Sequence, residues 1–373
     1  MKYFIIAGEQ SGDLHGSNLV RELFRADSSA IIKCWGGDLM ESAGATLLMH
    51  YRKTAFMGFV TVVKNLHAIT SYLNLCRSQI TEFAPDVVIL IDYPGFNLRI
   101  AGFAKESGFK VFYYISPKLW AWNEKRVEKV RRYVDRMYII FPFEEDFYKG
   151  HGIKAEYRGN PLMDEIERRK LALPDNDIIR SSLGIDGKPV IALVAGSRRN
   201  EVEYVLPQMV RAAEIFGQYR FIVTGVGHLP DELYLKIIGD KPVTLIKDMT
   251  YEVLSISEAA LVTSGTATLE TALFNVPQVV CFRGDFISMA IAWMVIRVKF
   301  ISLVNLILGY EAVKELIQYS LNEKTIGAEL KSVLPGGSKR ERMLEDYRKL
   351  RQILGPSGAS ARVAGDIIAN LSA

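Results

Sequence analysis

A polar, glycine-containing loop follows the first apolar run of the chain, where a predicted strand gives way to a helix. The loop spans residues 8–16, and its chemically useful members are Glu9, Ser11, Gly12 and Asp13. Glycines in such a loop let a ligand approach the backbone, and the helix start offers N–H groups to an anion. The spacing is not that of a dinucleotide fingerprint, which disfavours NAD. Because Ser11 or Asp13 could instead cap the helix, a ligand role and a structural role both stand.

A carboxylate, Asp92, directly follows the apolar run at residues 87–91. The carboxyl ends of strands are where an α/β sheet presents catalytic groups. A carboxylate beside apolar neighbours tends to have a raised pKa, which suits a general base. Asn97, five residues further on, joins the same candidate site. The alternative is that Asp92 only caps the turn before Pro94.

Two loops in the C-terminal half have the composition of phosphate sites. The first, with Gly196, Ser197 and Arg198, follows an apolar run, and a guanidinium can bind a diphosphate through its planar fork. The second places small and hydroxyl-bearing residues at a predicted helix start, namely Ser264, Gly265, Thr266 and Ala267. Glu270 lies further along that helix, at a distance that suits a ribose hydroxyl pair. A solvated arginine pair and a simple helix cap are the alternatives.

Two apolar features could serve a sugar or a lipid. Trp120 lies in a segment, residues 116–122, that contains two tryptophans. Residues 56–75 carry one charge and place apolar side chains at helical spacing, at Phe59, Val62, Val63, Leu66, Ile69 and Leu73. Basic residues flank this stretch, so one interpretation is an interfacial helix that touches a membrane and binds acyl chains. Packing in the core is the other interpretation of both features.

Composition and charge exclude several classes of protein. The 373 residues are 49% hydrophobic and 24% charged, which is ordinary for a globular chain. The longest uncharged runs near residue 300 are far shorter than the roughly 20 residues of a spanning helix. Residues 1–163 hold 21 of the 46 basic and 17 of the 42 acidic residues, so the whole excess of +4 lies there. That excess is too small for a duplex DNA binder, but it fits a half that meets an anionic ligand or surface.

Cysteine and histidine usage indicates the compartment and the absence of a metal site. Three widely spaced cysteines among apolar neighbours are expected to be buried free thiols in a reducing, cytosolic compartment. The apolar run at residues 3–7 is shorter than the apolar core of a signal peptide, so no signal peptide is expected. The five histidines are dispersed, so no metal site is predicted.

The elements that must position these residues alternate between strands and helices. Strands are predicted at residues 3–7, 31–35, 87–91, 111–115 and 137–141, and again at 190–195, 221–224, 243–246, 259–263 and 278–281. The alternation predicts an α/β fold with two doubly wound Rossmann-like domains facing a central cleft. We expect domains at residues 1–163 and 164–338, and C-terminal helices at 339–373 that pack on the first domain or on a partner subunit.

An ordered set of motifs resembles the lipid-A-disaccharide synthase family, which has the GT-B architecture. The set comprises Gly8-Glu9-Gln10-Ser11-Gly12-Asp13, residues 91–97, residues 116–122, Pro142-Phe143-Glu144, Gly196-Ser197-Arg198 and residues 264–270. Each motif alone is weak, but together they span nearly the whole chain in the family's order.

The resemblance implies an inverting glycosyltransferase that needs no metal or other cofactor. It would join UDP-2,3-diacylglucosamine to 2,3-diacylglucosamine 1-phosphate, giving a β-1,6-linked disaccharide 1-phosphate and UDP. Asp92 is the expected base, with Glu9 second. Arg198 and residues 264–266 would bind the diphosphate, Glu270 the ribose, and Asn305 would line the donor site. The resemblance also implies a peripheral location on the cytoplasmic face of the inner membrane of Gram-negative bacteria, an anionic lipid surface as partner, and allows a homodimer.

Three alternatives remain open from the residues themselves. Two are other GT-B enzymes, a peptidoglycan-type N-acetylglucosaminyltransferase or a UDP-sugar 2-epimerase. The third is a non-catalytic UDP-sugar sensor, which would bind UDP through Arg198 and Glu270 but would tolerate the loss of Asp92.

Overall fold

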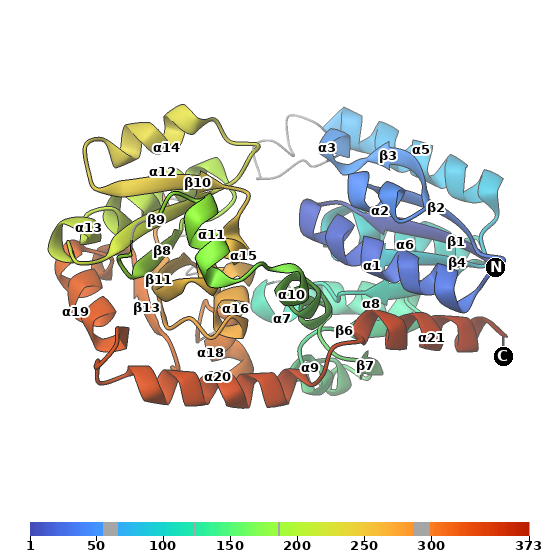
Figure 1. The fold of residues 1–373 in the computed structure, drawn as a ribbon. Helices are drawn as coiled ribbons and strands as arrows, with labels where there is room; N and C mark the ends of the chain where they lie inside the picture. Colours follow the sequence, from blue (N-terminus) through green and yellow to red (C-terminus); the bar gives the residue numbers. More distant parts are fainter. Residues whose placement is uncertain (55–65, 123, 186, 286–298, 373) are drawn as a thin grey trace. The chain divides into compact units, whose positions relative to one another are not determined.

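The chain forms two compact units, each built around one parallel sheet (Figure 1). The structure, a computed structural model, describes residues 1–54, 66–122, 124–185, 187–285 and 299–372. The first unit combines Met1–Asp164 with Pro356–Ala373, and the second is Glu165–Gly355. The C-terminal helices expected at residues 339–373 are therefore divided between the units: α20 (Arg340–Leu354) belongs to the second and α21 (Ala359–Ser372) to the first.

The sheet of the first unit has seven parallel strands in the order β3-β2-β1-β4-β5-β6-β7. They are β1 (Lys2–Ala7), β2 (Ile31–Gly36), β3 (Thr46–His50), β4 (Val87–Ile91), β5 (Lys110–Tyr114), β6 (Arg136–Ile139) and β7 (Ala155–Tyr157). The five strands predicted from apolar runs are confirmed. The two edge strands, β3 and β7, were not predicted, because their residues are only partly buried and lack a continuous apolar run.

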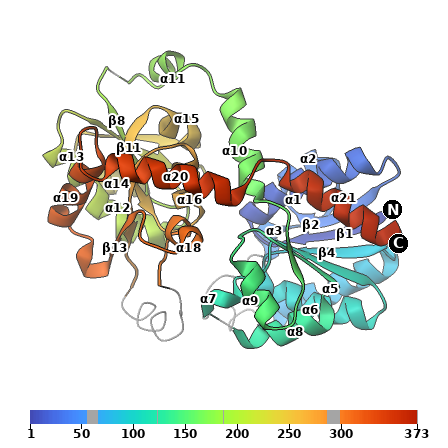
Figure 2. The ribbon, with the colours of Figure 1, turned by 90° about the horizontal axis from the view of Figure 1, so that it is seen from below.

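Helices cover both faces of this sheet. They are α1 (Gln10–Ala26), α2 (Asp38–Ser42), α3 (Tyr51–Thr54), α5 (Leu66–Phe83), α6 (Pro94–Glu106), α7 (Leu119–Trp122), α8 (Val127–Tyr133), α9 (Glu144–Gly150) and α21, with a 3-10 turn at Glu124–Arg126. Buried side chains of α5, α6 and α8 share one core with the sheet. Those of α1 and α21, which lie side by side in Figures 1 and 2, share the other.

The second unit repeats the arrangement with six parallel strands in the order β10-β9-β8-β11-β12-β13. They are β8 (Val190–Val194), β9 (Arg220–Gly225), β10 (Val243–Lys247), β11 (Ser257–Thr263), β12 (Gln278–Phe282) and β13 (Lys314–Ile317). Only β13, an edge strand, was missed by the apolar pattern. The helices are α10 (Pro161–Ala172), which begins in the first unit, α11 (Asn176–Ser182), α12 (Arg199–Met209), α13 (Ala212–Ile215), α14 (Asp231–Ile238), α15 (Thr250–Ser255), α16 (Thr266–Leu273), α18 (Leu303–Leu308), α19 (Glu323–Val333) and α20, with a 3-10 turn at Gln318–Ser320.

The strand order of each sheet creates one point where the chain reverses its direction of winding. In the first sheet this switch point lies between β1 and β4, and in the second it lies between β8 and β11. Loops that follow the two strands diverge there, which leaves a crevice at the carboxyl edge where such folds bind ligands. Four of the predicted motifs follow these four strands, so the fold brings them together in pairs.

A capping interaction attaches the C-terminal helix to the first unit. The carboxylate of Asp164 accepts hydrogen bonds from the backbone N–H groups of Gly358 (2.6 Å), Ala359 (3.1 Å) and Ser360 (3.0 Å). These donors lie at the start of α21, where the first turn has no partners of its own and a negative charge is favourable.

Replacing Asp164 with Ala removes this cap. We expect the free energy of unfolding to fall by about 1–2 kcal/mol and amide exchange in the first turn of α21 to accelerate. The control is Asp175→Ala, since Asp175 precedes α11 without a side-chain capping bond. Equal effects of the two substitutions on stability and exchange would contradict the capping role.

Candidate active site

Asp92 sits in a strained turn at the carboxyl end of β4. Its φ is +43° and that of Tyr93 is +47°, both in the left-handed region that non-glycine residues seldom adopt. Ile115, which directly follows the neighbouring strand β5, has a φ of +61°. A β-branched residue rarely adopts this conformation, and the Asp92 N–H donates to the Ile115 carbonyl (3.2 Å). Strain of this kind clusters at functional sites, where the surrounding structure holds it in place.

The side-chain amide of Asn97 holds this turn against both strands of the switch point. Its Nδ2 donates to the carbonyls of Asp92 (2.8 Å) and Ile91 (3.1 Å), and more weakly to that of Ile6 in β1 (3.5 Å). The hydroxyl of Tyr113 also donates to the Asp92 carbonyl. Asn97 is fully buried, so the structure gives this residue a positioning role.

The environment of Asp92 suits a proton acceptor. Burial raises the pKa of the carboxyl above its ordinary value, whereas the charge of Lys118 and the backbone N–H of Tyr93 lower it. Lys118 is exposed and lies in the loop after β5. A carboxylate with a raised pKa is a stronger base than one with an ordinary pKa.

Glu9 lies on the other side of the same switch point. A Cβ on Gly8 would meet the ring of Tyr93 at 2.2 Å, so only glycine lets the loop after β1 pack against the loop after β4. Burial raises the pKa of Tyr93 to about 12, and the charge of Glu9 adds to that rise. The structure therefore brings together Glu9 and the Asp92 turn, as the motifs predicted.

Asp13 has a structural role that the sequence did not reveal. Its buried carboxylate accepts hydrogen bonds from the N–H groups of Gly37 (2.8 Å), Leu39 (3.1 Å) and Met40 (3.1 Å) at the start of α2. It therefore caps α2 and does not cap α1, the helix to which it belongs. Gly12 is buried, and a Cβ there would lie 3.2 Å from the side chain of Ala7, whereas Ser11 is exposed.

Trp120 belongs to a cluster centred on the buried carboxylate of Glu144. Oε1 of Glu144 accepts from Trp120 Nε1 (2.9 Å) and Ser116 Oγ (2.7 Å). Its Oε2 accepts from the N–H groups of Ile140 (3.1 Å) and Phe141 (3.0 Å). Burial raises the pKa of Glu144, and these hydrogen bonds oppose the rise. The cluster fixes the loop that carries Lys118 beside Asp92.

In the second unit, Glu201 organises the loop after β8. Its Oε2 accepts from the N–H groups of Ser197 (3.1 Å) and Arg198 (3.2 Å), and Oε1 meets the Arg198 guanidinium at 3.3 Å. Gly196 has a φ of +98°, and a Cβ there would lie 2.4 Å from the Glu201 carboxylate. His228, in the loop after β9, contacts the Ser197 carbonyl at 2.9 Å. Arg198 remains exposed at the carboxyl edge.

The loop after β11 opens α16 with exposed small residues. Gly265 has a φ of +144°, and Gly265 and Thr266 are exposed, with Ala267 half-buried. The Ser264 hydroxyl donates to the Ile301 carbonyl at 2.7 Å, so it is engaged by the protein. Further along α16, Glu270 accepts from the hydroxyl of Tyr251 (3.0 Å), and burial raises the pKa of Glu270. This loop and the Arg198 loop follow the two strands of the second switch point.

The side chain of Asn305 forms hydrogen bonds with groups of the second unit, to which it belongs. It is fully buried, accepts from the N–H groups of Ala312 (2.8 Å) and Val313 (2.9 Å), and donates to the Val313 carbonyl (2.9 Å) and to Glu315 Oε1 (2.9 Å). These four bonds use both acceptor and both donor positions of an amide.

Part of the predicted acyl-binding stripe packs in the core. Leu73 is buried in the core of the first unit, and Ile69 packs against it. Phe59, Val62 and Val63 lie outside the described residues, as does the side chain of Leu66. In the part of the chain that the structure describes, no helix is long and apolar enough to cross a membrane. The three cysteines are buried and free, as predicted.

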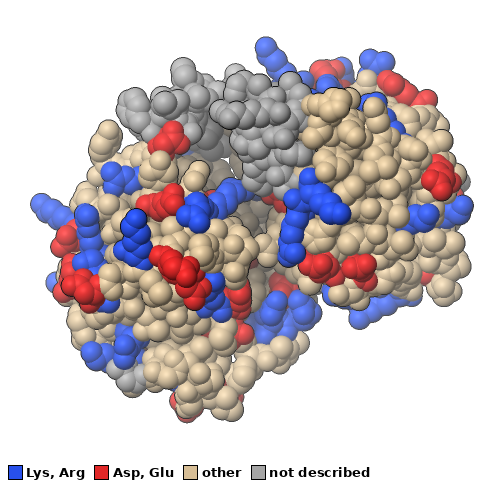
Figure 3. Space-filling model, turned by 90° about the horizontal axis from the view of Figure 1, so that it is seen from above, with Lys and Arg blue, Asp and Glu red and all other residues tan. Residues whose placement is uncertain are grey.

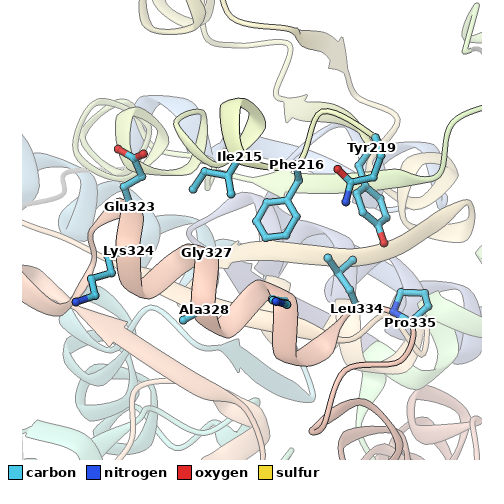
Figure 4. Close-up of a pocket in the computed structure, with 11 residues that line it drawn as sticks. Ile215, Phe216, Tyr219, Glu323, Lys324, Gly327, Ala328, Leu334 and Pro335 are labelled. Carbon is cyan, nitrogen blue, oxygen red and sulfur yellow. The ribbon is translucent and has the colours of Figure 1, made fainter.

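A surface pocket of about 620 Å³ lies away from these loops, between α13 and α19 (Figure 4). Its lining includes Phe216, Tyr219 and Leu334. Tyr219 directly precedes β9, so the pocket is near the amino ends of the strands and contains none of the predicted site residues.

Two residues that organise the site, Glu201 and Glu315, were not singled out by the sequence, and Glu144 was noted only as part of the Pro142-Phe143-Glu144 motif. A signal existed for Glu201. It lies three residues after Arg198, the N-cap of α12, and a glutamate at this position is typical of a capping box. No comparable pattern marks Glu315, because its partners lie ten or more residues away in the chain.

Comparisons with known proteins agree with the geometry. The family described as lipid-A-disaccharide synthetase matches residues 3–364. Relatives named lipid-A-disaccharide synthase include one from Syntrophus aciditrophicus, 37% identical over 96% of this chain and 95% of the relative. Another, from Geobacter sulfurreducens, is 35% identical over 98% and 96%.

Solved structures show the same fold at low identity. A UDP-GlcNAc 2-epimerase from Neisseria meningitidis superimposes with a TM-score of 0.69 and 14% identity, covering 99% of this chain and 100% of that one. The calicheamicin glycosyltransferase CalG4 gives 0.61 and 16%, covering 99% and 98%. The fold is therefore GT-B. Given the family match and the identity to its curated members, the chain belongs to the lipid-A-disaccharide synthase family of glycosyltransferases.

Proposed function

We propose that this chain transfers 2,3-diacylglucosamine from UDP to the 6-hydroxyl of 2,3-diacylglucosamine 1-phosphate, with Asp92 as the general base. The hydroxyl oxygen attacks the anomeric carbon from the face opposite UDP, and its proton passes to the Asp92 carboxylate. The bond between the anomeric carbon and the diphosphate oxygen breaks, and its electron pair leaves with UDP. Attack from the opposite face accounts for inversion.

The observation that carries this proposal is the environment of Asp92. The carboxyl combines a raised pKa with a nearby cation, Lys118, and occupies a strained turn at a switch point. A raised pKa brings a carboxylate closer to the operating pH, where a general base is most effective. Glu9, in the adjoining loop, is the second candidate for the base.

The donor half of the proposal assigns the nucleotide to the second unit. Arg198 and the unpaired N–H groups at the start of α16, including those of Thr266 and Ala267, would neutralise the diphosphate as it leaves. Glu270 would bind the ribose hydroxyls, in exchange for or beside its bond from Tyr251. Support comes from the exposure of these loops at the carboxyl edge of the sheet, where α/β folds bind nucleotides.

Because both proposed substrates are lipids, the proposal includes contact with a membrane. We propose that residues 56–66 bind acyl chains or the bilayer at the cytoplasmic face of the inner membrane, whereas Leu73 is buried in the core and Ile69 packs against it. Basic and acidic side chains are interspersed over the face shown in Figure 3. Attraction to anionic lipid would therefore depend on local groups beside this stretch, such as Lys53 and Arg77, more than on the net charge. A homodimer stays a prediction.

Turnover with both lipid substrates in detergent tests the function. We expect UDP and disaccharide 1-phosphate in equal amounts from the native chain. Asp92→Asn should retain UDP binding and lower turnover by about 10²–10⁴-fold, because the amide cannot accept the proton. UDP binding without disaccharide in the native chain would contradict the function, and unchanged turnover in Asp92→Asn would remove Asp92 from the mechanism.

The same variant should be more stable than the native chain. Because the folded-state pKa of Asp92 is raised, ionising the carboxyl as the pH rises through that pKa destabilises the fold, whereas Asn carries no such penalty and tolerates a positive φ. We expect a gain of roughly 1 kcal/mol at neutral pH, as is common when function is traded for stability. Chemical denaturation at two pH values measures it.

Lys118→Met should move the acid limb of the pH–rate profile. The charge of Lys118 lowers the pKa of Asp92, so its removal raises that pKa and shifts the loss of activity to higher pH. Lys149→Met, on the exposed surface of α9, is the control and should leave the limb in place. Equal profiles for the two variants would refute the coupling between Lys118 and the base.

Arg198→Gln should weaken UDP binding by about tenfold to a hundredfold, the range expected for losing hydrogen bonds from a charged group. The matched control is Arg199→Gln, since the neighbouring Arg199 is also exposed and pairs with Glu203 at 3.2 Å. Calorimetric titration with UDP measures both. Equal affinities would show that Arg198 does not contact the nucleotide.

A further inference from the structure

We propose that Glu315 is a positioning residue for the donor site: it holds the segment that fixes the start of α16, and Asn305 acts through it. The inference rests on the proposed role of α16 in nucleotide binding. In this inference Asn305 helps to hold the donor loop in place, whereas the sequence analysis expected this residue to line the donor site.

The carboxylate of Glu315 gathers three donors at one end of β13. Its Oε1 accepts from the Ser302 N–H (2.9 Å) and from Asn305 Nδ2 (2.9 Å), and both oxygens lie within 3.2 Å of the Ile301 N–H. Ser302 and Asn305 are fully buried. Hydrogen bonds to a charged acceptor are stronger than neutral ones, so this carboxylate fixes the backbone at residues 301–302.

That backbone in turn holds the donor loop at two points. The Ile301 carbonyl accepts from the Ser264 hydroxyl at 2.7 Å, immediately before α16. The Leu303 N–H donates to Thr268 Oγ1 at 3.3 Å, and the same hydroxyl donates to the Gly265 carbonyl at 2.8 Å. A displacement of residues 301–303 therefore reaches Ser264 and Gly265, which flank the exposed N–H groups of the helix.

Asn305 contributes to this support and has no group left for a ligand. All four of its hydrogen-bonding positions are occupied, one of them by Glu315. A nucleotide could reach its amide only by displacing buried bonds. Loss of Asn305 should thus impair donor binding indirectly, through the position of Glu315 and residues 301–303.

Glu315→Gln is the informative substitution because it keeps the shape and removes the charge. An amide has one acceptor oxygen, so its NH₂ group would face the Ile301 N–H, from which Oε2 now accepts a hydrogen bond at 3.0 Å. We expect UDP affinity to fall by about tenfold or more, KM for the donor to rise, and the acid limb of the pH–rate profile, set in the first unit, to stay in place.

The matched control is Glu258→Gln in the same sheet. Glu258 is also half-buried, pairs with Arg340 at 3.2 Å, and lies near the amino end of β11. It should lower stability and leave UDP affinity unchanged. Should Glu315→Gln fail to fold, Thr268→Val removes the second link at nearly constant volume and should also weaken UDP binding.

Titration with UDP of folded protein, with stability measured separately, decides the matter. Weaker binding in Glu315→Gln but not in Glu258→Gln supports the inference. Native-like affinity in Glu315→Gln, whatever its stability, overturns it. If the native chain itself binds no UDP, the proposed function fails and this inference fails with it. If the native chain binds UDP and Glu315→Gln binds it equally well, only this inference fails, so the two failures are distinguishable.

Discussion

The amide of Asn97 is the interaction on which the candidate site depends most. By donating to carbonyls at the ends of β1 and β4, it holds the two strands of the switch point and the left-handed turn that carries Asp92. Left-handed backbone is costly for a non-glycine residue, and it persists only where the surroundings fix it. The position of the proposed base is therefore a consequence of the sheet's topology and of one buried amide.

Acidic side chains perform a related task throughout both units. Loops at the carboxyl edge of a parallel sheet expose N–H groups that must be satisfied when they are buried. This chain satisfies many of them with carboxylates that accept from two or more donors, at Asp13, Glu144, Glu201 and Glu315. Several acidic residues in the family motifs, Asp13 and Glu144 among them, thus build the site.

The sequence predicted the central strands and the loops at both switch points, because buried parallel strands are continuous apolar runs and the motifs directly follow them. It could not predict the edge strands β3, β7 and β13, most of whose residues are only partly buried. Nor could it separate positioning from contact. Asp13 and Asn305 look like ligand-binding residues in the sequence. In the fold, backbone N–H groups from elsewhere in the chain donate hydrogen bonds to their side-chain oxygens. The sequence also could not show that Ile69 and Leu73 pack in the core, because core helices and interfacial helices have the same spacing of apolar side chains.

The central claim is that Asp92 accepts the proton of the attacking hydroxyl. A crystal structure of Asp92→Asn with both lipid substrates tests it most directly, because the blocked reaction leaves the acceptor in place. We expect the acceptor 6-hydroxyl within about 3 Å of the side-chain oxygen of residue 92. A hydroxyl that meets the carboxylate of Glu9 instead, with residue 92 out of reach, would contradict the claim.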